Sequence, residues 1–306
     1  MRVTHPRPIG ARARPVSGAA LAWLGVLAFS MSTPMTKIAL RDLDPVVVSL
    51  GRAAVASVLA GACLLARRAS LPTAPQIRQL VAVAGGVVLG SPLLAAIALR
   101  HTDSAHGSII LGLTPLATAG LAVARAGERP SALYWLAGGC GIVAVSAFTM
   151  RSGGGSWRAA DALLFLGVVA AAVGFAEGAL LARQMPAWQV ISWALVLSAP
   201  VAWVGAALTV AKTRLTAPAE DWLAFSYVAS VSMFLAFFAF YAGLARLGIA
   251  RGSQLQLAQP ALAITWGWPM LGERLTPEAV ATVVIVLFAV AAGRRATVNP
   301  GSRRAQ

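Results

Sequence analysis

The chain has 306 residues, of which 58% are hydrophobic and only 11% are charged. Soluble globular proteins carry about 25% charged residues, so this composition excludes an ordinary water-soluble domain, a disordered chain and a collagen-like chain. The two cysteines, Cys63 and Cys140, are too few for a disulfide scaffold or the usual zinc motifs. The net charge of +15 fits either nucleic-acid binding or the orientation of membrane spans, and the positions of the basic residues decide between them.

Ten apolar windows follow one another along the chain, each close to the roughly 20 residues that a helix needs to cross the membrane. Apolar runs of this length predict α-helices, because the strands of a membrane barrel have about ten residues of alternating polarity. The first window is longer than the apolar part of a signal peptide, so we do not expect it to be cleaved. The predicted spans are residues 19–40, 45–66, 79–99, 104–124, 131–150, 162–182, 187–211, 222–245, 252–271 and 278–293.

The basic residues are shared unevenly between the two sides that these spans define. An even number of spans places both termini on one side, and sixteen of the 25 Lys and Arg residues fall there. Lys37 and Arg52 lie within spans, and the other seven fall on the far side: Arg41, Arg100, Arg151, Arg158, Lys212, Arg214 and Arg274. Since basic residues collect in the cytoplasm, we predict a multi-pass protein of the plasma (inner) membrane with both termini cytoplasmic. The basic tails, 1–18 and 294–306, are expected to contact lipid, and no nucleic-acid partner is expected.

The second half of the chain repeats the first. A shift of 145 residues aligns Gly107-Ser108 with Gly252-Ser253, Pro115 with Pro260, and Gly127-Glu128-Arg129 with Gly272-Glu273-Arg274. Each half holds five spans, an odd number, so the two halves are predicted to cross the membrane in opposite senses. Such inverted repeats are typical of secondary transporters, which bind substrate near the midplane between the halves. We therefore predict an all-α integral membrane protein of ten transmembrane helices, with repeats over 19–150 and 162–293 joined by a linker over 151–161.

These motifs also occur in a recognisable order. Arg52 lies in the second span, a proline interrupts the fourth and ninth spans, and Gly272-Glu273-Arg274-Leu275 follows the ninth. Over nearly the whole chain this order resembles the EamA family of the drug/metabolite transporter superfamily. The first copy of the signature, Gly127-Glu128-Arg129-Pro130, departs from the pattern only at its last position. The resemblance implies two EamA repeats of five helices each and transport of a small metabolite, often outward.

The repeated Gly-Glu-Arg motif also has a physical interpretation. Gly127 and Gly272 are placed where a helix ends, a position that favours glycine because the backbone often turns left-handed there. Glu128 and Glu273 are then expected near the start of the next helix, where a carboxylate meets the positive end of the helix dipole. We interpret the motif as a structural corner.

Three charged residues are predicted inside the spans, where a charge is costly and indicates function. Glu177 lies roughly 8 Å deep in the sixth span and is interpreted as a group for proton or cation coupling, or as a Glu satisfied by a neighbouring helix. Arg52, roughly 10 Å deep in the second span, is either a structural anchor or a contact for an anionic ligand. A pair between Arg52 and Glu177 stays open. Lys37 lies near the end of the first span, which is typical of a lysine whose charged group reaches the membrane interface. Thr33 shares its helix face, and a polar face of this kind instead indicates a cavity.

Uncharged side chains add further candidates for a substrate site. Gln256 and Gln259 share one face of the ninth span and either bind substrate or join helices by hydrogen bonds. Phe237 and Tyr241 share a face of the eighth span, where they either line a cavity, pack against neighbours or, for Tyr241, mark the interface.

Three prolines predict broken helices, because proline leaves a backbone carbonyl without its usual partner. Pro34 falls in the first span, and Pro115 and Pro260 occupy equivalent positions in the two halves. Broken helices related by an internal repeat indicate a transport site.

Together these features predict a secondary transporter that exports a small organic metabolite, amino-acid-like or drug-like, by alternating access. Membrane lipid and a small-molecule substrate are the expected partners, with protons as a candidate coupling ion. We expect no metal, no cofactor and no enzymatic activity, because the chain has no nucleotide-binding loop and no clustered acidic or His ligands. The alternatives are an intramembrane enzyme acting on lipid or prenyl substrates, and a channel.

Overall fold

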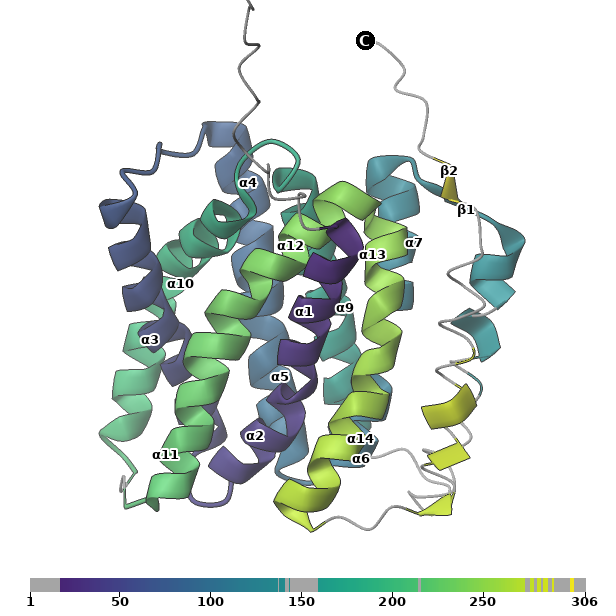
Figure 1. Cartoon of the computed structure of the whole chain (residues 1–306). Coiled ribbons are helices and arrows are strands. Elements are labelled where there is room, and N and C mark those ends of the chain that lie inside the picture. The colour runs from purple at the N-terminus through teal and green to yellow at the C-terminus, as the bar shows by residue number, and fades with distance from the viewer. Residues whose placement is uncertain are drawn as a thin grey trace, which may run out of the picture.

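The computed structural model describes residues 17–136, 138–140, 143, 159–213, 216–272, 276–277, 280–281, 283–285, 288 and 298–299. Long helices run roughly side by side through this part of the chain and form a bundle (Figure 1). Half of the predicted fifth span, most of the tenth span, and residues 151–158 of the predicted linker lie outside the described residues. Residues 159–161 of the predicted linker already belong to the helix of the sixth span.

Six of the predicted spans are confirmed as helical segments long and apolar enough to cross a membrane. Helix α3 (Pro45–Ala66), α9 (Ala159–Leu181) and α10 (Ala187–Val210) are single helices. The other three are built from consecutive pieces: α1 (Gly18–Ser30) and α2 (Ser32–Ala39); α4 (Ala74–Val83), the π-helical η1 (Ala84–Gly90) and α5 (Ser91–Leu99); α11 (Ala219–Ser226), the π-helical η2 (Tyr227–Leu235) and α12 (Ala236–Leu247).

The predicted fourth and ninth spans are each interrupted near their middle. The fourth consists of α6 (Ser104–Leu111) and α7 (Thr114–Ala126), and the ninth of α13 (Ile249–Gln254), the 3-10 turn η3 (Leu255–Leu257) and α14 (Ala258–Leu271). The two spans correspond closely, because the shift of 145 residues carries the first residue of α6 onto the first residue of α13.

Both spans end in the same way. Gly127 follows α7 with φ of 65°, and Gly272 follows α14 with φ of 67°, both left-handed. This confirms the expected glycine corners, since a residue with a Cβ atom is strained in that conformation.

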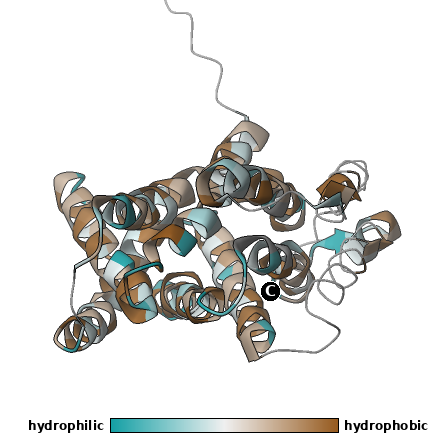
Figure 2. Cartoon of the chain, turned by 90° about the horizontal axis from the view of Figure 1, so that it is seen from below, coloured by the Kyte–Doolittle hydropathy of each residue, from teal (hydrophilic) through white to brown (hydrophobic). Residues whose placement is uncertain are grey.

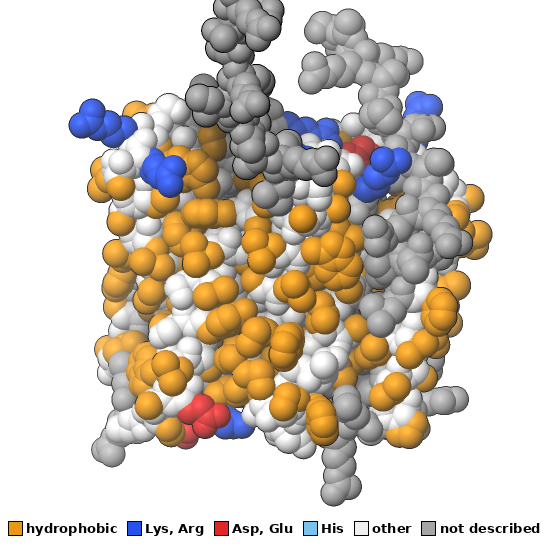
Figure 3. Space-filling view, viewed as in Figure 1, with side chains coloured by type: hydrophobic (Ala, Val, Ile, Leu, Met, Phe, Trp, Pro, Cys, Tyr) orange, Lys and Arg blue, Asp and Glu red, His pale blue; other side chains and the backbone are white. Residues whose placement is uncertain are grey.

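The helices pack in a regular pattern between the two halves of the chain. Helix α1 packs along α12, α3 along α10, and α5 along α9, while α7 contacts α13 and α6 contacts α14. In Figure 2, which looks along the bundle, the helices are seen nearly end-on and hydrophobic segments occur on most of them. Figure 3 shows a broad hydrophobic belt on the side of the molecule, with Lys and Arg side chains near its edges.

The residues at the two ends of the bundle can be told apart. Gly18 lies beside Leu247, and Gly248 beside Glu128, so these residues share one end, which we call the N-terminal end. Strand β1 (Arg129–Pro130) is also here and pairs antiparallel with β2 (Val298–Asn299). The first and last described parts of the chain therefore lie at the same end of the bundle.

Close helix contacts require glycine at Gly86, in η1. A Cβ atom there would lie 2.4 Å from the carbonyl oxygen of Ala170 and 2.9 Å from the amide nitrogen of Gly174, both on α9. Because backbone atoms cannot move aside as a flexible side chain can, the third and sixth spans approach this closely only with glycine at this position.

We expect Gly86→Ala to lower the free energy of unfolding by about 1–3 kcal/mol, the usual cost of overpacking. Gly120 of α7 is the matched control, because nothing lies within 4 Å of the Cβ atom that Gly120→Ala adds. Thermal unfolding in detergent measures both variants. Equal melting temperatures for Gly86→Ala and wild type would contradict the packing argument.

Candidate functional site

A cavity of about 140 Å³ lies between the two halves of the chain, where the interrupted spans meet. Its walls come from α1, α2, α3, η1, α5, α6 and α7 of the first half and from α9, η2, α12, η3 and α14 of the second. The lining includes Thr36 and Leu99, near the end of the bundle opposite the N-terminal end. The cavity therefore extends from the middle of the bundle toward that opposite end.

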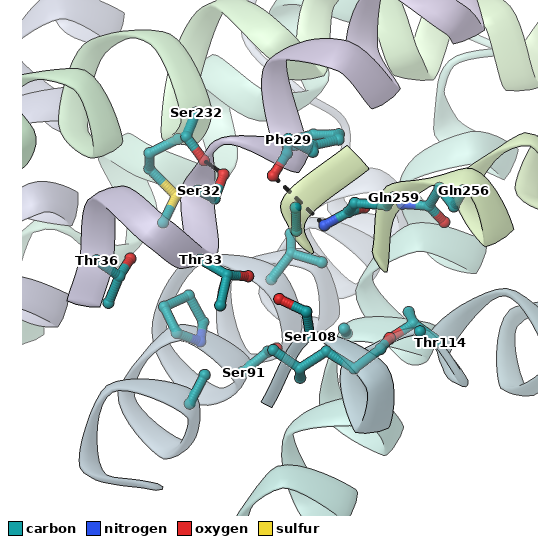
Figure 4. Close-up of a pocket in the computed structure, with 18 of the residues that line it drawn as sticks. Phe29, Ser32, Thr33, Thr36, Ser91, Ser108, Thr114, Ser232, Gln256 and Gln259 are labelled. Carbon is teal, nitrogen blue, oxygen red and sulfur yellow. Dashed lines mark hydrogen bonds between the residues drawn. The ribbon is translucent and has the colours of Figure 1, made fainter. Parts of the chain in front are cut away.

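The walls of the cavity carry neutral polar groups. Figure 4 shows hydroxyl and amide side chains from several helices turned into the same space, and the residues labelled there are Ser32, Thr33, Thr36, Ser91, Ser108, Thr114, Ser232, Gln256 and Gln259, beside Phe29. Ser32 and Ser232 hydrogen-bond to each other across the two halves. Among the lining residues Arg52 is the one with a charged side chain, and no carboxylate is present.

Arg52 is buried, with 8% of its surface exposed, and its Nε has no hydrogen-bond partner among the described residues. Ser49, one turn earlier on α3, donates its hydroxyl to the carbonyl of Pro45 instead. A guanidinium group has five N–H donors and no acceptor, so it needs anionic or carbonyl oxygens around it. The structure thus places an uncompensated positive charge on the cavity wall.

Two more polar atoms on the cavity wall are buried without a hydrogen-bond partner in the described part of the chain, the side-chain oxygens of Ser108 and Gln256. Gln259 donates a long hydrogen bond of 3.4 Å to the carbonyl of Phe29, beside the break between α1 and α2. Buried polar groups in native proteins are nearly always paired. These free atoms therefore mark places where a ligand or water completes the hydrogen bonding.

Aromatic side chains close the cavity toward the N-terminal end. Phe29, Phe175, Phe237, Phe240 and Tyr241, named here the aromatic layer, pack with ring centroids 4.8 to 6.4 Å apart. The first three also line the cavity, so they present an apolar wall to any ligand. Tyr241 lies outside the cavity and donates a hydrogen bond of 3.0 Å to the carbonyl of Gly174.

Lys37 does not line the cavity. Its ammonium group donates to the carbonyl oxygens of Leu99 at 2.8 Å and Thr102 at 2.6 Å, at the end of α5. A cation is favourable at a helix C-terminus, where carbonyl groups lack partners within the helix. Lys37 thus joins the first span to the third.

Glu177 is buried but lies away from the cavity, near the N-terminal end. Its two oxygens accept hydrogen bonds from Arg125 at 2.6 Å and from Gln79 at 3.0 Å. The pair with Arg52 left open above is not formed in this structure. Arg125 belongs to the first half of the chain, so the ion pair joins the two halves.

A second ion pair joins the halves at the same end. Glu128 accepts hydrogen bonds from the amide groups of Ile249 and Ala250, and from Arg183 at 2.8 Å. The carboxylate therefore meets a helix N-terminus, as expected, but that of α13 in the other half and not that of the following helix. Glu273, its counterpart in the repeat, lies outside the described residues.

The prolines coincide with the interruptions. Helix α2 begins two residues before Pro34, α7 one residue before Pro115, and α14 two residues before Pro260. Proline fits the first turn of a helix, where its missing N–H would have no partner within the helix. Pro115 lines the cavity, Pro34 does not, and the side chain of Pro260 is outside the described part.

Sequence reasoning missed one buried pair, His106 of α6 and Asp161 of α9, whose Nε2 and Oδ1 atoms lie 2.8 Å apart. The predicted fourth and sixth spans both start on the same side of the membrane. This placement could have indicated that His106 and Asp161 lie at the same end of the molecule. Among the described residues, no group of three or more His, Cys, Asp or Glu side chains could hold a metal ion.

Comparison with known proteins agrees with this architecture. The model of a family described as EamA-like transporters matches residues 16–150 and 158–292, so both halves of the chain match the same family. The uncharacterized transporter YdeK of Bacillus subtilis (strain 168) is 41% identical over 273 residues, which cover 89% of this chain and 95% of that protein. A solved structure described only as a crystal structure of a protein has a TM-score of 0.71 at 16% identity, over 91% of this chain and 99% of its own, and is similar in fold alone.

The pair of Arg125 and Glu177 leads to an asymmetric prediction. Arg125→Ala leaves a buried carboxylate without its cation, whereas Glu177→Gln leaves a half-exposed guanidinium that water can solvate. We expect Arg125→Ala to destabilise the protein by about 1–3 kcal/mol more than Glu177→Gln, measured by thermal unfolding in detergent. The double variant should recover part of this loss, and equal effects of the two single variants would contradict the assignment.

Proposed function

Because the chain belongs to the EamA-like transporter family, we propose that it carries a small organic carboxylate across the membrane and binds it in the central cavity. The observation that supports this proposal is the buried guanidinium of Arg52 on the cavity wall, which has no partner among the described residues.

The charge balance of the cavity favours an anionic group on the substrate. A buried charge is expensive unless it is paired, and the described lining offers Arg52 no carboxylate. A bound carboxylate would supply two acceptor oxygens that match the planar donors of a guanidinium group. A cationic substrate would instead add a second positive charge beside the first.

The rest of the lining indicates the shape of the substrate. Phe29, Phe175 and Phe237 offer an apolar wall, while the free oxygen atom of Gln256 can accept a hydrogen bond from an amino or hydroxyl group. The cavity of about 140 Å³ is smaller than the pockets of roughly 300–1,000 Å³ that enclose drug-sized ligands. An amino-acid-like metabolite therefore fits the site better than a drug.

The movement that we propose is alternating access between two inverted repeats of five helices, over residues 19–150 and 162–293. The helix pairing supports this symmetry. If spans one to five are exchanged with spans six to ten, the contact between the first and eighth spans becomes a contact between the sixth and third spans, and both contacts are present. The pairs of second and seventh spans, and of fourth and ninth spans, are each carried onto themselves. In this scheme the aromatic layer and the two ion pairs at the N-terminal end close one side while the cavity opens toward the other.

We assign Glu177 to this closure in preference to proton coupling, because both of its oxygens are already engaged, one by the guanidinium of Arg125 and the other by the amide of Gln79. We also propose that both termini lie in the cytoplasm of a plasma-membrane protein, as the distribution of Lys and Arg indicates. The closed side is then the cytoplasmic one. The outward direction of transport is a separate proposal, which rests on the family resemblance.

The rival functions make different predictions. A channel would conduct without saturation, and an intramembrane enzyme would convert its ligand chemically. Saturable movement of unmodified carboxylate against its concentration gradient, into vesicles that contain the purified protein, excludes both.

The role of Arg52 is tested by thermal shift measurements with a panel of amino acids, other small carboxylates and their matching amides. We expect carboxylates, but not the amides, to raise the melting temperature of wild type; a ligand at 100 times its Kd stabilises by about 2.7 kcal/mol. Arg52→Gln should lose this response yet melt no lower than wild type without ligand, because it removes an unpaired buried charge.

Arg52→Lys should respond weakly, because an ammonium group cannot form the planar two-point contact. Arg41→Gln is the matched control, since Arg41 is exposed, pairs with Glu220 and does not line the cavity. If Arg52→Gln melts well below wild type and still responds to carboxylates, Arg52 is a structural anchor and the assignment is wrong.

A further inference from the structure

Two polar atoms of the cavity wall, besides those of the Arg52 guanidinium, are buried without a partner among the described residues. They are Oε1 of Gln256, on η3 in the second half, and Oγ of Ser108, on α6 in the first half. The two residues are 3% and 4% exposed, and both line the same cavity as Arg52. Because a buried polar atom is costly unless it is paired, both atoms bear on the choice of substrate.

Ser108 differs from its counterpart in the repeat. The shift of 145 residues carries Ser108 onto Ser253, whose hydroxyl donates to the carbonyl of Ala250 at 3.1 Å, within α13. A serine that bonds back in this way is satisfied by its own helix. Ser108 has no such partner in the described part of the chain, and its hydroxyl is turned into the cavity (Figure 4). Of the two equivalent serines, the one on the cavity wall is therefore the one left for a ligand.

The free atom of Gln256 is an acceptor, because Oε1 is the carbonyl oxygen of the side-chain amide. It needs a donor, and an ionised carboxylate has none. The group that Arg52 attracts therefore cannot satisfy Gln256. A substrate that satisfies both residues carries a second polar group, which is either an uncharged donor such as a hydroxyl or a positively charged ammonium group.

The charges on the cavity wall distinguish these two kinds of donor. A carboxylate that carries no other charge neutralises Arg52 and leaves the cavity with no net charge. A zwitterion brings an ammonium group as well, and the described lining offers no carboxylate to balance it. In a cavity of about 140 Å³ the ammonium group would also lie close to the guanidinium of Arg52, and like charges repel. An uncharged donor avoids both costs.

The carboxylates of α9 do not change this balance, although α9 is the one described element of the cavity wall that has any. Glu177 lies outside the lining and is bound by Arg125 and Gln79. Asp161 also lies outside the lining and is bound by His106 and by at least one further interaction. Neither carboxylate faces a ligand in the cavity.

We propose that the substrate is a small hydroxycarboxylate, whose carboxylate binds Arg52 and whose hydroxyl group binds Gln256 and Ser108. A hydroxyl group can donate to the oxygen of Gln256 and accept from the hydroxyl of Ser108 at the same time, whereas an ammonium group has no acceptor. This inference rests on the proposed function, because it takes the carboxylate site at Arg52 as given. It narrows the amino-acid-like metabolites to the hydroxy acids of similar size.

The test compares ligands that differ in one group, by thermal shift titration of the purified full-length protein at pH 7. The ligands are 4-methylpentanoate, its 2-hydroxy and 3-hydroxy derivatives, and the two matching amino acids. We expect the better hydroxy acid to bind wild type about fivefold more tightly than 4-methylpentanoate, which is the usual effect of one hydrogen bond. The amino acid with the same position of substitution should bind at least about tenfold more weakly than that hydroxy acid, because its ammonium group is unbalanced.

Substitutions on the cavity wall test which residues cause this preference. Gln256→Met keeps the length of the side chain but removes the acceptor, so it should bind 4-methylpentanoate as wild type does and lose the fivefold preference for the hydroxy acid. Ser108→Ala should reduce the preference, and it tests the site alone if Gln256→Met does not fold. Gln189→Met is the matched control and should keep the preference, because Gln189 of α10 is buried but does not line the cavity.

The possible results separate this inference from the proposed function. Amino acids that bind as tightly as the hydroxy acid would overturn the inference and leave the carboxylate site intact. So would a preference that persists in both Gln256→Met and Ser108→Ala, or one that Gln189→Met also removes. If none of the five ligands stabilises wild type, or if they stabilise Arg52→Gln equally well, the carboxylate site and the inference both fail.

Discussion

In a membrane protein every backbone N–H and C=O group inside the apolar layer needs a partner within the protein. Long apolar helices meet this requirement along most of this chain, and each place where a helix is interrupted needs another solution. The interruptions here face the interior, where Thr114 donates its hydroxyl to the carbonyl of Leu111 and Gln259 reaches the carbonyl of Phe29. The breaks therefore occur where polar side chains can reach them, and the same polar side chains then line a cavity.

The three charged residues inside the spans obey the same constraint in different ways. Lys37 is satisfied by the carbonyl groups at the end of α5, and Glu177 by Arg125 and Gln79. Arg52 has no such partner in the described part of the chain, although it is as deeply buried as Glu177. The structure thus separates two charges that hold helices together from one that has no partner among the described residues.

The sequence predicted the helices well because hydropathy and length depend on each span alone. The positions of the breaks followed from Pro115 and Pro260, and the left-handed corners from Gly127 and Gly272, since both effects are local to the backbone. The partners of the buried charges were not predictable in the same way. Arg125 and Glu177 are 52 residues apart, and their contact depends on how α7 packs against α9. The role of Glu128 shows the same limit, since a helix dipole was correctly expected but the helix that supplies it belongs to the other repeat.

The contacts between the halves include ion pairs at both ends of the molecule. At the N-terminal end each half supplies one carboxylate and one arginine: Glu128 of the first half binds Arg183 of the second, and Glu177 of the second half binds Arg125 of the first. At the other end the exposed pair of Arg41 and Glu220 and the buried pair of His106 and Asp161 join the same two halves. Because every one of these contacts takes one partner from each half, they hold only while the two halves lie together at that end, whichever half moves.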